Sequence, residues 1–291
     1  MIGGAVVGTG SAMTSNPPAE LIVFVHVPKT AGMTLRALFR RMYGSEAVYT
    51  ARNPEGGLAD PEPLVQMPES ELSRYRAVVG HLQFGIHELI DRPVRYVTFL
   101  REPIDRTLSD YYYLRRTHSA SASVRRYEMA EYLRRGELAN LQTRLIGGTL
   151  AERAKPADEA DLARAKERID QCFDAVGVIE RFDESVLLMG EALGWRFFFH
   201  RPENVGARPD VDTVDPEHLA IIEEINRLDI ELYQHARRRV DSVIAARGRR
   251  FAAKARLLGM VSRGSEAALR SPVAAPLRAG WRRTRRFAVR S

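Results

Sequence analysis

Short runs of apolar and β-branched residues recur along the chain, each bounded by polar or turn-forming residues. They cover residues 21–27, 77–79, 95–100 and 175–179. Runs of this length that are apolar at successive positions predict strands buried on both faces of a sheet.

Between and after these runs, the apolar positions recur with the period of a helix. This pattern predicts helices over residues 34–43, 103–116, 124–135, 138–146, 158–171, 183–193 and 216–247. The first of them carries Leu35, Leu38, Phe39 and Met42 on one face. Strands that alternate with helices predict an α/β fold, in which a parallel β-sheet is flanked by helices on both faces. Ligands bind at the carboxyl ends of the strands in such sheets, so we expect the chemistry in the segments after residues 27, 79 and 100.

The two ends of the chain differ in composition from the middle. Residues 1–20 are rich in Gly, Ala, Ser and Pro and lack a positively charged start, so we expect a disordered leader rather than a secretion signal. Residues 21–247 are expected to form the folded domain, and residues 248–291 a basic, flexible tail. No run approaches the ~18 apolar residues that a membrane-spanning helix needs.

The positive net charge belongs to the tail. From residue 251 onward the chain has ten Arg or Lys and one acidic residue, so the net charge of +7 leaves the remaining body nearly neutral. A neutral body argues against a nucleic-acid-binding protein. The arginines and aromatic residues of the tail suit an anionic membrane surface, so we expect a cytoplasmic protein with peripheral contact at the inner face of the membrane. A single cysteine, Cys172, excludes an intramolecular disulfide and a thiolate-rich metal site.

The first segment with chemical potential reads His26-Val-Pro-Lys-Thr-Ala-Gly-Met-Thr34 and joins a predicted strand to a predicted helix. Backbone N–H groups and the positive end of a helix favour an anion at such a junction. Lys29 adds a positive charge, and Thr30 and Thr34 add hydroxyl donors. The spacing G-x-x-x-x-G-K-[ST] of ordinary P-loop enzymes is absent. The segment predicts a different phosphate loop, although a capped turn with a surface lysine explains Lys29 alone equally well.

The second segment begins at Arg101, directly after the predicted strand 95–100. Ser109 follows eight residues later, about two helical turns into the next helix. A guanidinium group and a hydroxyl that converge in this way form a second phosphate clamp. Taken alone, the segment has a simpler explanation, in which Arg101 pairs with Glu102 or Asp105 and Ser109 is a neutral helix residue.

Together, the two segments resemble the superfamily of sulfotransferases that use 3′-phosphoadenosine 5′-phosphosulfate (PAPS). The resemblance is to the carbohydrate branch that includes the heparan sulfate 2-O-sulfotransferases and bacterial relatives. HVPKTAGMTL is similar to the 5′-phosphosulfate loop of that branch, and FLREPIDRTLSDYYYLRR to its 3′-phosphate motif. Ala31 stands where the pattern has glycine, and Met33 where it has a small or hydroxyl residue. Weaker similarities, including Asn140-Leu-Gln-Thr-Arg144, extend over residues 21–236.

The resemblance implies a three-layer αβα sulfotransferase fold with a P-loop-like sheet, and an enzyme that needs no metal. It implies that the 5′-phosphosulfate is held by the loop residues Pro28, Lys29, Thr30, Ala31, Gly32, Met33, Thr34 and Leu35. Arg101 and Ser109 are implied to hold the 3′-phosphate.

The third segment ends in Gly80-His81, directly after the predicted strand 77–79. Sulfuryl transfer needs a general base, and an unperturbed histidine has a suitable pKa of about 6.5. The resemblance assigns His81 to this role and Lys29 to stabilisation of the leaving phosphate. A structural histidine in a turn is the alternative for His81, and His87 is the second candidate for the base. His26 is expected to shape the loop.

A late loop at residues 201–209 follows a strand-like run at residues 195–199 and contains Arg208. Many sulfotransferases close a basic loop of this kind over the nucleotide, and the resemblance extends that role to Arg208. A plain surface loop explains this arginine equally well.

These features lead to one main hypothesis. The chain is expected to be a sulfotransferase that moves a sulfuryl group from PAPS to a hydroxyl of a carbohydrate or glycolipid and releases PAP, the 3′,5′-bisphosphate. A nucleotide kinase or phosphotransferase and a non-catalytic PAP-binding protein of the same fold are the alternatives. The missing P-loop spacing argues against the kinase, and the joint presence of Lys29, His81, Arg101 and Ser109 argues against a non-catalytic protein. The sequence names neither the acceptor nor the oligomeric state.

Overall fold

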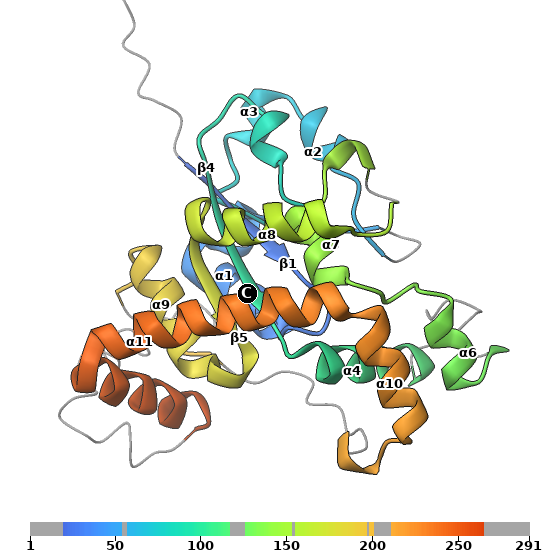
Figure 1. The fold of residues 1–291 in the computed structure, drawn as a ribbon. Helices are drawn as coiled ribbons and strands as arrows, with labels where there is room; N and C mark the ends of the chain where they lie inside the picture. Colours follow the sequence, from blue (N-terminus) through green and yellow to red (C-terminus); the bar gives the residue numbers. More distant parts are fainter. Residues whose placement is uncertain are drawn as a thin grey trace, which may run out of the picture.

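A parallel β-sheet lies at the centre of the molecule (Figure 1). The computed structural model describes residues 20–53, 57–116, 126–152, 155–196, 198–200 and 211–264. Within them, the sheet has five strands in the order β2-β3-β1-β4-β5. These are β1 (Leu21–His26), β2 (Val48–Ala51), β3 (Ala77–Gly80), β4 (Val94–Leu100) and β5 (Phe173–Val178). The predicted α/β class with a parallel sheet is confirmed.

The first strand occupies the middle of the sheet. β1 pairs in parallel with β3 on one side and with β4 on the other, and Val25 lies opposite both Gly80 and Thr98. Because the three strands run in the same direction, their carboxyl ends meet at one edge of the sheet. The three segments singled out in the sequence therefore leave the sheet side by side.

Successive β1 residues point to opposite sides of the sheet. Both sets are apolar, so helices cover both faces. Leu21, Val23 and Val25 pack on one face against α7 (Leu141–Gly147), α8 (Glu159–Gln171) and the first part of α11 (Arg227–Ser262). Ile22 and Phe24 pack on the other face against α1 (Gly32–Tyr43) and α9 (Phe182–Ala192). In Figure 1, α8 and α11 lie in front of the sheet and α1 lies behind it. The result is the expected three-layer αβα arrangement.

A separate apolar cluster joins three helices beside the sheet. Leu108 and Tyr111 of α4 (Pro103–Arg116) pack against α6 (Met129–Arg134) and α10 (Pro216–Ile225) (Figure 1). The short elements are α2 (Glu62–Val65), α3 (Glu69–Leu72) and the 3₁₀ turns at Ser45–Ala47, Ile86–Glu88, Leu150–Glu152, Ile179–Arg181 and Val211–Thr213. The cluster fixes α4, which carries Ser109, at the carboxyl edge of the sheet.

The predicted single helix over residues 216–247 is wrong, since Asn226 separates α10 from α11. Its backbone leaves the helical range at φ −113°. Its side-chain amide instead donates to the Thr107 hydroxyl at 3.1 Å and to the Ile222 carbonyl at 2.9 Å. The break thus anchors these helices to α4. Two further expectations differ: β2 was not predicted, and the described residues of the run 195–199 do not form a strand.

The expected start of the flexible tail at residue 248 also differs from the structure. Gly248 adopts φ 70° inside α11, and the helix continues to Ser262 after this turn. Phe251 and Leu258 are buried against the two main apolar clusters. The packed part of the chain therefore extends at least to Ser262, whereas residues 1–19 and 265–291 lie outside the described residues. Among the described helices, none combines the length and the apolar character needed to span a bilayer.

Candidate active site

The loop between β1 and α1 has the geometry of an anion-binding turn. The Thr30 hydroxyl is buried and donates to the Val27 carbonyl at 2.8 Å, which closes the loop. Lys29 and Ala31 both adopt left-handed backbone conformations, with φ of 69° and 56°. A Cβ on Gly32 would lie 1.7 Å from His26 Nε2, so only glycine fits at that position.

The N-terminus of α1 has no side-chain cap and no nearby negative charge in its first turn. Ala31 occupies the N-cap position, no side chain caps the helix, and its first turn contains no acidic residue. The positive end of a helix favours an anion. The observed loop is therefore consistent with the anion-binding role expected for residues 28–34.

The Lys29 ammonium lies against α4. Its Nζ atom is 3.7 Å from the centre of the Tyr113 ring, a cation–π contact. Burial lowers the pKa of the Lys29 ammonium; the Asp110 carboxylate opposes this shift and the Arg101 guanidinium adds to it. Lys29 is thus directed toward the helix that carries Ser109.

Arg101 links the predicted phosphate loop at Lys29 to the predicted phosphate clamp on α4. Its Nη1 donates to the Lys29 carbonyl at 3.0 Å, and its Nε donates to Asp105 Oδ2 at 2.7 Å. Asp105, Ser109 and Tyr113 are spaced four residues apart and lie on one face of α4. Ser109 makes no side-chain hydrogen bond with another described residue. The structure thus brings Lys29, Arg101 and Ser109 to the same face of the molecule.

His81 lies next to this cluster, directly after β3. Its Nδ1 lies 2.7 Å from the His26 carbonyl oxygen. A carbonyl can only accept, so Nδ1 carries the proton, and Nε2 of the neutral ring keeps its lone pair. The His81 and His26 rings stack with their centres 4.4 Å apart. Burial lowers the pKa of His81, so the ring is neutral at pH 7. The Nε2 atom has the protonation state that a general base requires.

His87 lies in a different setting. Its Nδ1 is 2.9 Å from the Tyr96 hydroxyl, and its ring packs edge-on against Phe84. Phe84 and Tyr96 belong to the apolar cluster that α7 and α8 cover. The contacts of His87 therefore join it to that cluster, and the structure brings His81, not His87, next to the β1–α1 loop.

A buried carboxylate beside the cluster was missed in the sequence. Asp110 is 7% exposed and pairs with the fully buried Arg106 at 3.4 Å. Burial raises the pKa of Asp110, and the positive charges of Arg106 and Lys29 and the nearby His81 oppose this shift. An acidic residue next to Ser109 in a tyrosine-rich helix is the signal that could have revealed it.

One residue expected to contact the donor has its side chain in the core and not in this cluster. The Leu35 side chain is fully buried in the core behind the sheet, and its N–H donates to the Ala31 carbonyl. Arg208 lies outside the described residues. Pro28 is half-buried in the loop, and Met33 is 43% exposed at the start of α1. In the parts of the chain that the structure describes, no group of three or more His, Cys, Asp or Glu could hold a metal ion.

A hollow of about 260 Å³ lies elsewhere in the molecule. It is lined by Asp174 and Val176 of β5, by Leu188 and Glu191 of α9, and by Val240 of α11, among others. Asp174 is the second residue of β5. The hollow therefore opens near the amino end of an edge strand, away from the carboxyl edge where Lys29 and His81 lie.

The match to a protein-family model agrees with the motifs. Residues 4–263 match the family model described as galactose-3-O-sulfotransferase. Mouse galactose-3-O-sulfotransferase 2 is 24% identical over 247 residues, which cover 76% of this chain and 62% of the mouse protein. Among solved structures, mouse sulfotransferase SULT7A1 complexed with PAP matches with a TM-score of 0.36 and 16% identity, over 72% of this chain and 66% of that one. The chain thus spans somewhat less than two thirds of each of these relatives.

The family model covers nearly the whole described part of the chain, from before β1 to the end of α11. Its match contains the Lys29 loop, His81, Arg101 and Ser109. The expectation of a sulfotransferase is thereby confirmed at the level of the superfamily. The chain belongs to the galactose-3-O-sulfotransferase family.

Proposed function

We propose that the protein transfers a sulfuryl group from PAPS to a hydroxyl of a carbohydrate acceptor and releases PAP. The observation that carries this proposal is the hydrogen bond from Arg101 to the Lys29 carbonyl, at 3.0 Å. It joins the two cationic segments whose motifs match a donor with phosphate at both ends. The family match and the name of the mouse relative support a sulfated sugar hydroxyl as the product.

The residues at the carboxyl edge of the sheet fit PAPS. The 5′-phosphosulfate would lie at the open N-terminus of α1, near Lys29 and the backbone of residues 30–34. The 3′-phosphate would bind Arg101 and the Ser109 hydroxyl. The sulfuryl group of the donor supplies the electrophilic sulfur, and the phosphate of PAP is the leaving group.

His81 would act on the acceptor. Its Nε2 lone pair takes the proton of the attacking hydroxyl while the new bond between oxygen and sulfur forms. Lys29 stabilises the negative charge that develops on the leaving phosphate oxygen as the old sulfur–oxygen bond breaks. The proton ends on His81, and the electron pair ends on PAP, so the step balances without a metal.

The family match favours galactose as the acceptor sugar, free or within a glycolipid or glycan. The resemblance to heparan sulfate 2-O-sulfotransferases and to bacterial members stays a prediction about the branch within the superfamily. Radiolabelled PAPS incubated with a galactose-terminated and a uronate-containing oligosaccharide separates the two acceptors. Label on the galactose-terminated acceptor alone supports the proposal.

Binding measurements test the donor. We expect calorimetry to show tighter binding of PAP than of ADP, and no requirement for Mg²⁺. Tighter binding of ATP with Mg²⁺ than of PAP would support a kinase instead. PAP binding without transfer to any acceptor in a broad glycan panel would support a non-catalytic protein.

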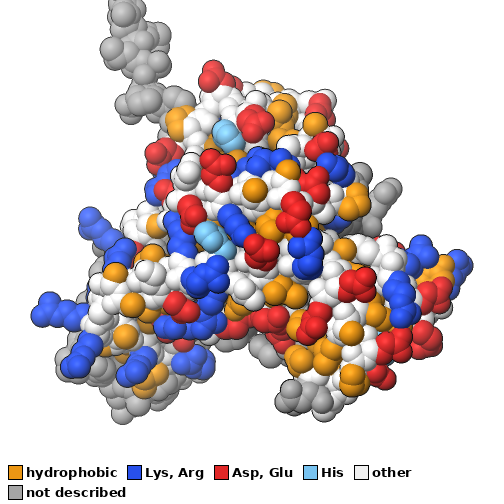
Figure 2. Space-filling model, viewed as in Figure 1, with side chains coloured by type: hydrophobic (Ala, Val, Ile, Leu, Met, Phe, Trp, Pro, Cys, Tyr) orange, Lys and Arg blue, Asp and Glu red, His pale blue; other side chains and the backbone are white. Residues whose placement is uncertain are grey.

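Contact with a membrane is proposed for the C-terminal part. Exposed Lys and Arg side chains gather over the end of α11, at lower left in Figure 2. They include Arg249, Arg250, Lys254 and Arg256. We propose contact with the cytoplasmic face of the membrane, so the protein should float with anionic vesicles. Neutral vesicles are the control. The tail deletion must begin after Gly264, because Phe251 and Leu258 belong to the core; unchanged flotation after this deletion and after charge reversal of the four residues would contradict the proposal.

A further inference from the structure

A buried amide from α7 holds the backbone of Arg101. The Gln142 side chain has no exposed surface. Its Oε1 accepts from the Arg101 N–H at 3.0 Å, and its Nε2 donates to the Arg101 carbonyl at 2.9 Å. Arg101 lies one residue beyond the end of β4. Gln142 therefore satisfies both backbone groups of this residue at the point where the strand ends.

The helix that carries Gln142 is fixed at its N-terminus. The buried Asp229 carboxylate of α11 accepts from the Gln142 N–H at 3.0 Å and from the Thr143 N–H at 2.7 Å. In return, Asn140 Oδ1 accepts from the N–H groups of Leu228 and Asp229. These reciprocal bonds lock the start of α7 to the start of α11.

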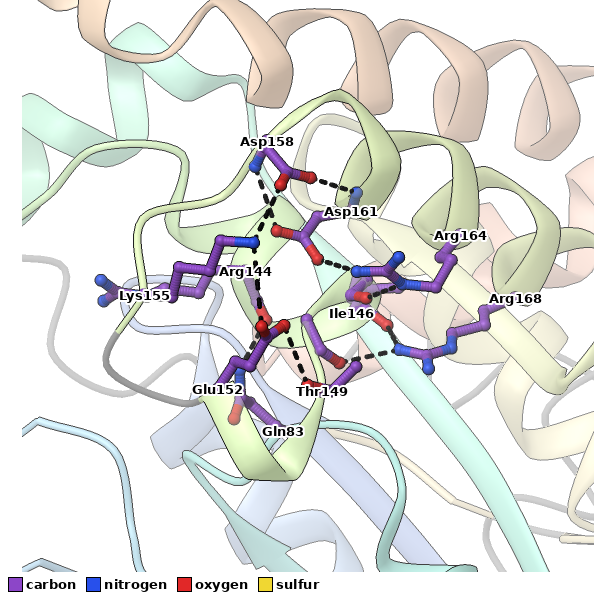
Figure 3. Close-up of polar contacts among 12 residues, drawn as sticks. Gln83, Arg144, Ile146, Thr149, Glu152, Lys155, Asp158, Asp161, Arg164 and Arg168 are labelled. Atoms are coloured by element: carbon purple, nitrogen blue, oxygen red, sulfur yellow. Dashed lines mark hydrogen bonds and ion pairs between the residues drawn. The ribbon is translucent and has the colours of Figure 1, made fainter.

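The other end of α7 is fixed as well (Figure 3). The last carbonyls of a helix have no partner within it. Here Gln83 Nε2 donates to the Arg144 carbonyl, Arg168 to the Ile146 and Gly148 carbonyls, and Arg164 to the Gly147 carbonyl. With both ends held, α7 is a rigid support for the Gln142 side chain.

The support extends through Arg101 to the donor loop. The Arg101 guanidinium reaches the carbonyl of Lys29, whose φ of 69° is rare for a residue with a Cβ. The position of that guanidinium depends on the direction of the Arg101 backbone. Gln142 thus lies behind both cationic groups without touching a ligand itself.

We propose that Gln142 is a positioning residue that directs Arg101, and thereby gives the site its preference for nucleotides with a 3′-phosphate. The inference rests on the proposed use of PAPS. Asp105 holds the Arg101 side chain by accepting from its Nε. Gln142 instead holds the Arg101 backbone through its N–H and carbonyl groups.

The test compares two nucleotides that differ only in the 3′-phosphate. Calorimetry gives the Kd of PAP and of 5′-AMP for the wild type, Gln142→Met and Gln142→Glu. Methionine has a similar volume and makes neither bond, and glutamate keeps the acceptor for the Arg101 N–H while losing the donor. We expect PAP to bind about 10- to 100-fold more weakly to Gln142→Met, the range seen when supporting groups or distant positions are changed. The affinity for 5′-AMP should stay that of the wild type, because this nucleotide has no 3′-phosphate for Arg101 to hold.

Gln83→Met is the matched control. It removes a buried side-chain amide that donates to the Arg144 carbonyl at the other end of α7. Its ratio of PAP to AMP affinity should equal that of the wild type. In an Arg101→Met background, the further change Gln142→Met should leave the ratio unaltered. If Gln142→Met does not fold, the ratio for Gln142→Glu decides.

The outcomes separate the inference from the function on which it rests. A wild type that binds PAP no more tightly than AMP overturns the proposed function and this inference together. A wild type with the preference, retained in the soluble Gln142 variants, overturns the inference alone. Equal weakening of PAP and AMP would show that Gln142 has only a general structural role.

Discussion

The N-terminus of α8 is capped by side chains, whereas that of α1 is not. At α8, Asp158 accepts from the Asp161 N–H and Asp161 accepts from the Asp158 N–H, both at 3.0 Å (Figure 3). Lys155 and Arg164 pair with these carboxylates. At α1, the N-cap residue is Ala31, in a left-handed conformation, and neither a capping side chain nor an acidic residue is present in the first turn.

This difference matches a structural role for the end of α8 and the proposed donor-binding role for the end of α1. The first N–H groups of any helix need an acceptor, and carboxylates near them are favourable. α8 finds its acceptors within its own sequence. α1 has no such cap, and Lys29 and Arg101 lie near its N-terminus, which is why we propose an anionic ligand there.

The largest effect is expected from removal of His81, the proposed base near the N-terminus of α1. His81→Asn keeps a polar group but removes the Nε2 lone pair, and kcat should fall about 10²- to 10⁴-fold. PAP affinity should change little, because His81 is proposed to act on the acceptor. His235→Asn, in a histidine paired with Asp170 on the surface, is the control. A full loss in His87→Asn together with an active His81→Asn would reassign the base.

The lysines near the two helix ends give a direct contrast. Lys29→Met should lower kcat about 10²- to 10³-fold, the cost of removing one group that stabilises transition-state charge. Lys155→Met removes an exposed lysine that pairs with the α8 cap and should leave kcat unchanged. Steady-state kinetics with saturating PAPS measure both. Similar rates in the two variants would mean that the open helix end does not use its lysine in catalysis.

The pH profile should also distinguish the α1 end. Burial lowers the pKa of His81 below the usual 6.5, so kcat/KM should be on its plateau at pH 7 and fall about tenfold per pH unit below that pKa.

The same pKa shift of His81, together with that of His26, makes the unfolded chain bind more protons than the folded one below pH 6.5. Stability should therefore decrease as the pH falls from 7 toward 5. A rate that rises on acidification would exclude a neutral His81 as the base.

At the α8 end, the expected effect is on stability. Asp158→Ala removes the capping side chain and should lower the free energy of unfolding by about 1 kcal/mol. PAP affinity should be unchanged, because the Asp158 cap bonds Asp161 and Lys155, which are not among the residues proposed to bind PAPS. Urea denaturation and calorimetry measure the two quantities. Weakened PAP binding in a variant that is still fully folded would contradict the separation of the two helix ends.

The smallest effect tests the α1 end with a carboxylate. Met33→Glu places an acidic side chain in the first turn of α1, which should stabilise the protein by about 0.3–1 kcal/mol. The same charge should weaken PAP binding by repelling the donor. Met33→Gln is the uncharged control. Stabilisation without any change in PAP affinity would mean that the donor anion does not lie at this helix end.

Strongly patterned elements could be predicted from the sequence. β1 is a nearly continuous apolar run and β4 is rich in β-branched and aromatic residues, and Pro103 marks the first residue of α4, whose expected bounds are those observed. The placement of Lys29, His81 and Arg101 at one edge followed from the rule that parallel strands end together. These inferences needed only local patterns and one topological rule.

Other features depend on partners far away in the chain. The break at Asn226 is stabilised by Thr107, and the role of Gln142 requires Arg101 as a neighbour. Asp110 is read from the sequence as an ordinary helix residue, since its burial appears only once α4 is packed. The apolar spacing of Phe251 and Leu258 was hidden by the arginines around them. Tertiary contacts, which no local pattern encodes, decide these positions.

The central place of β1 has a consequence for how the chain acquires its structure. β1 precedes both of its neighbours, β3 and β4, in the chain. Parallel strands pair only through such non-local contacts, which slow folding. Until β3 and β4 have left the ribosome, the two edges of β1 have none of their native pairing partners, and an exposed strand edge is prone to aggregate. Nascent chains that stop before Leu100 should therefore depend on chaperones more than those that include it.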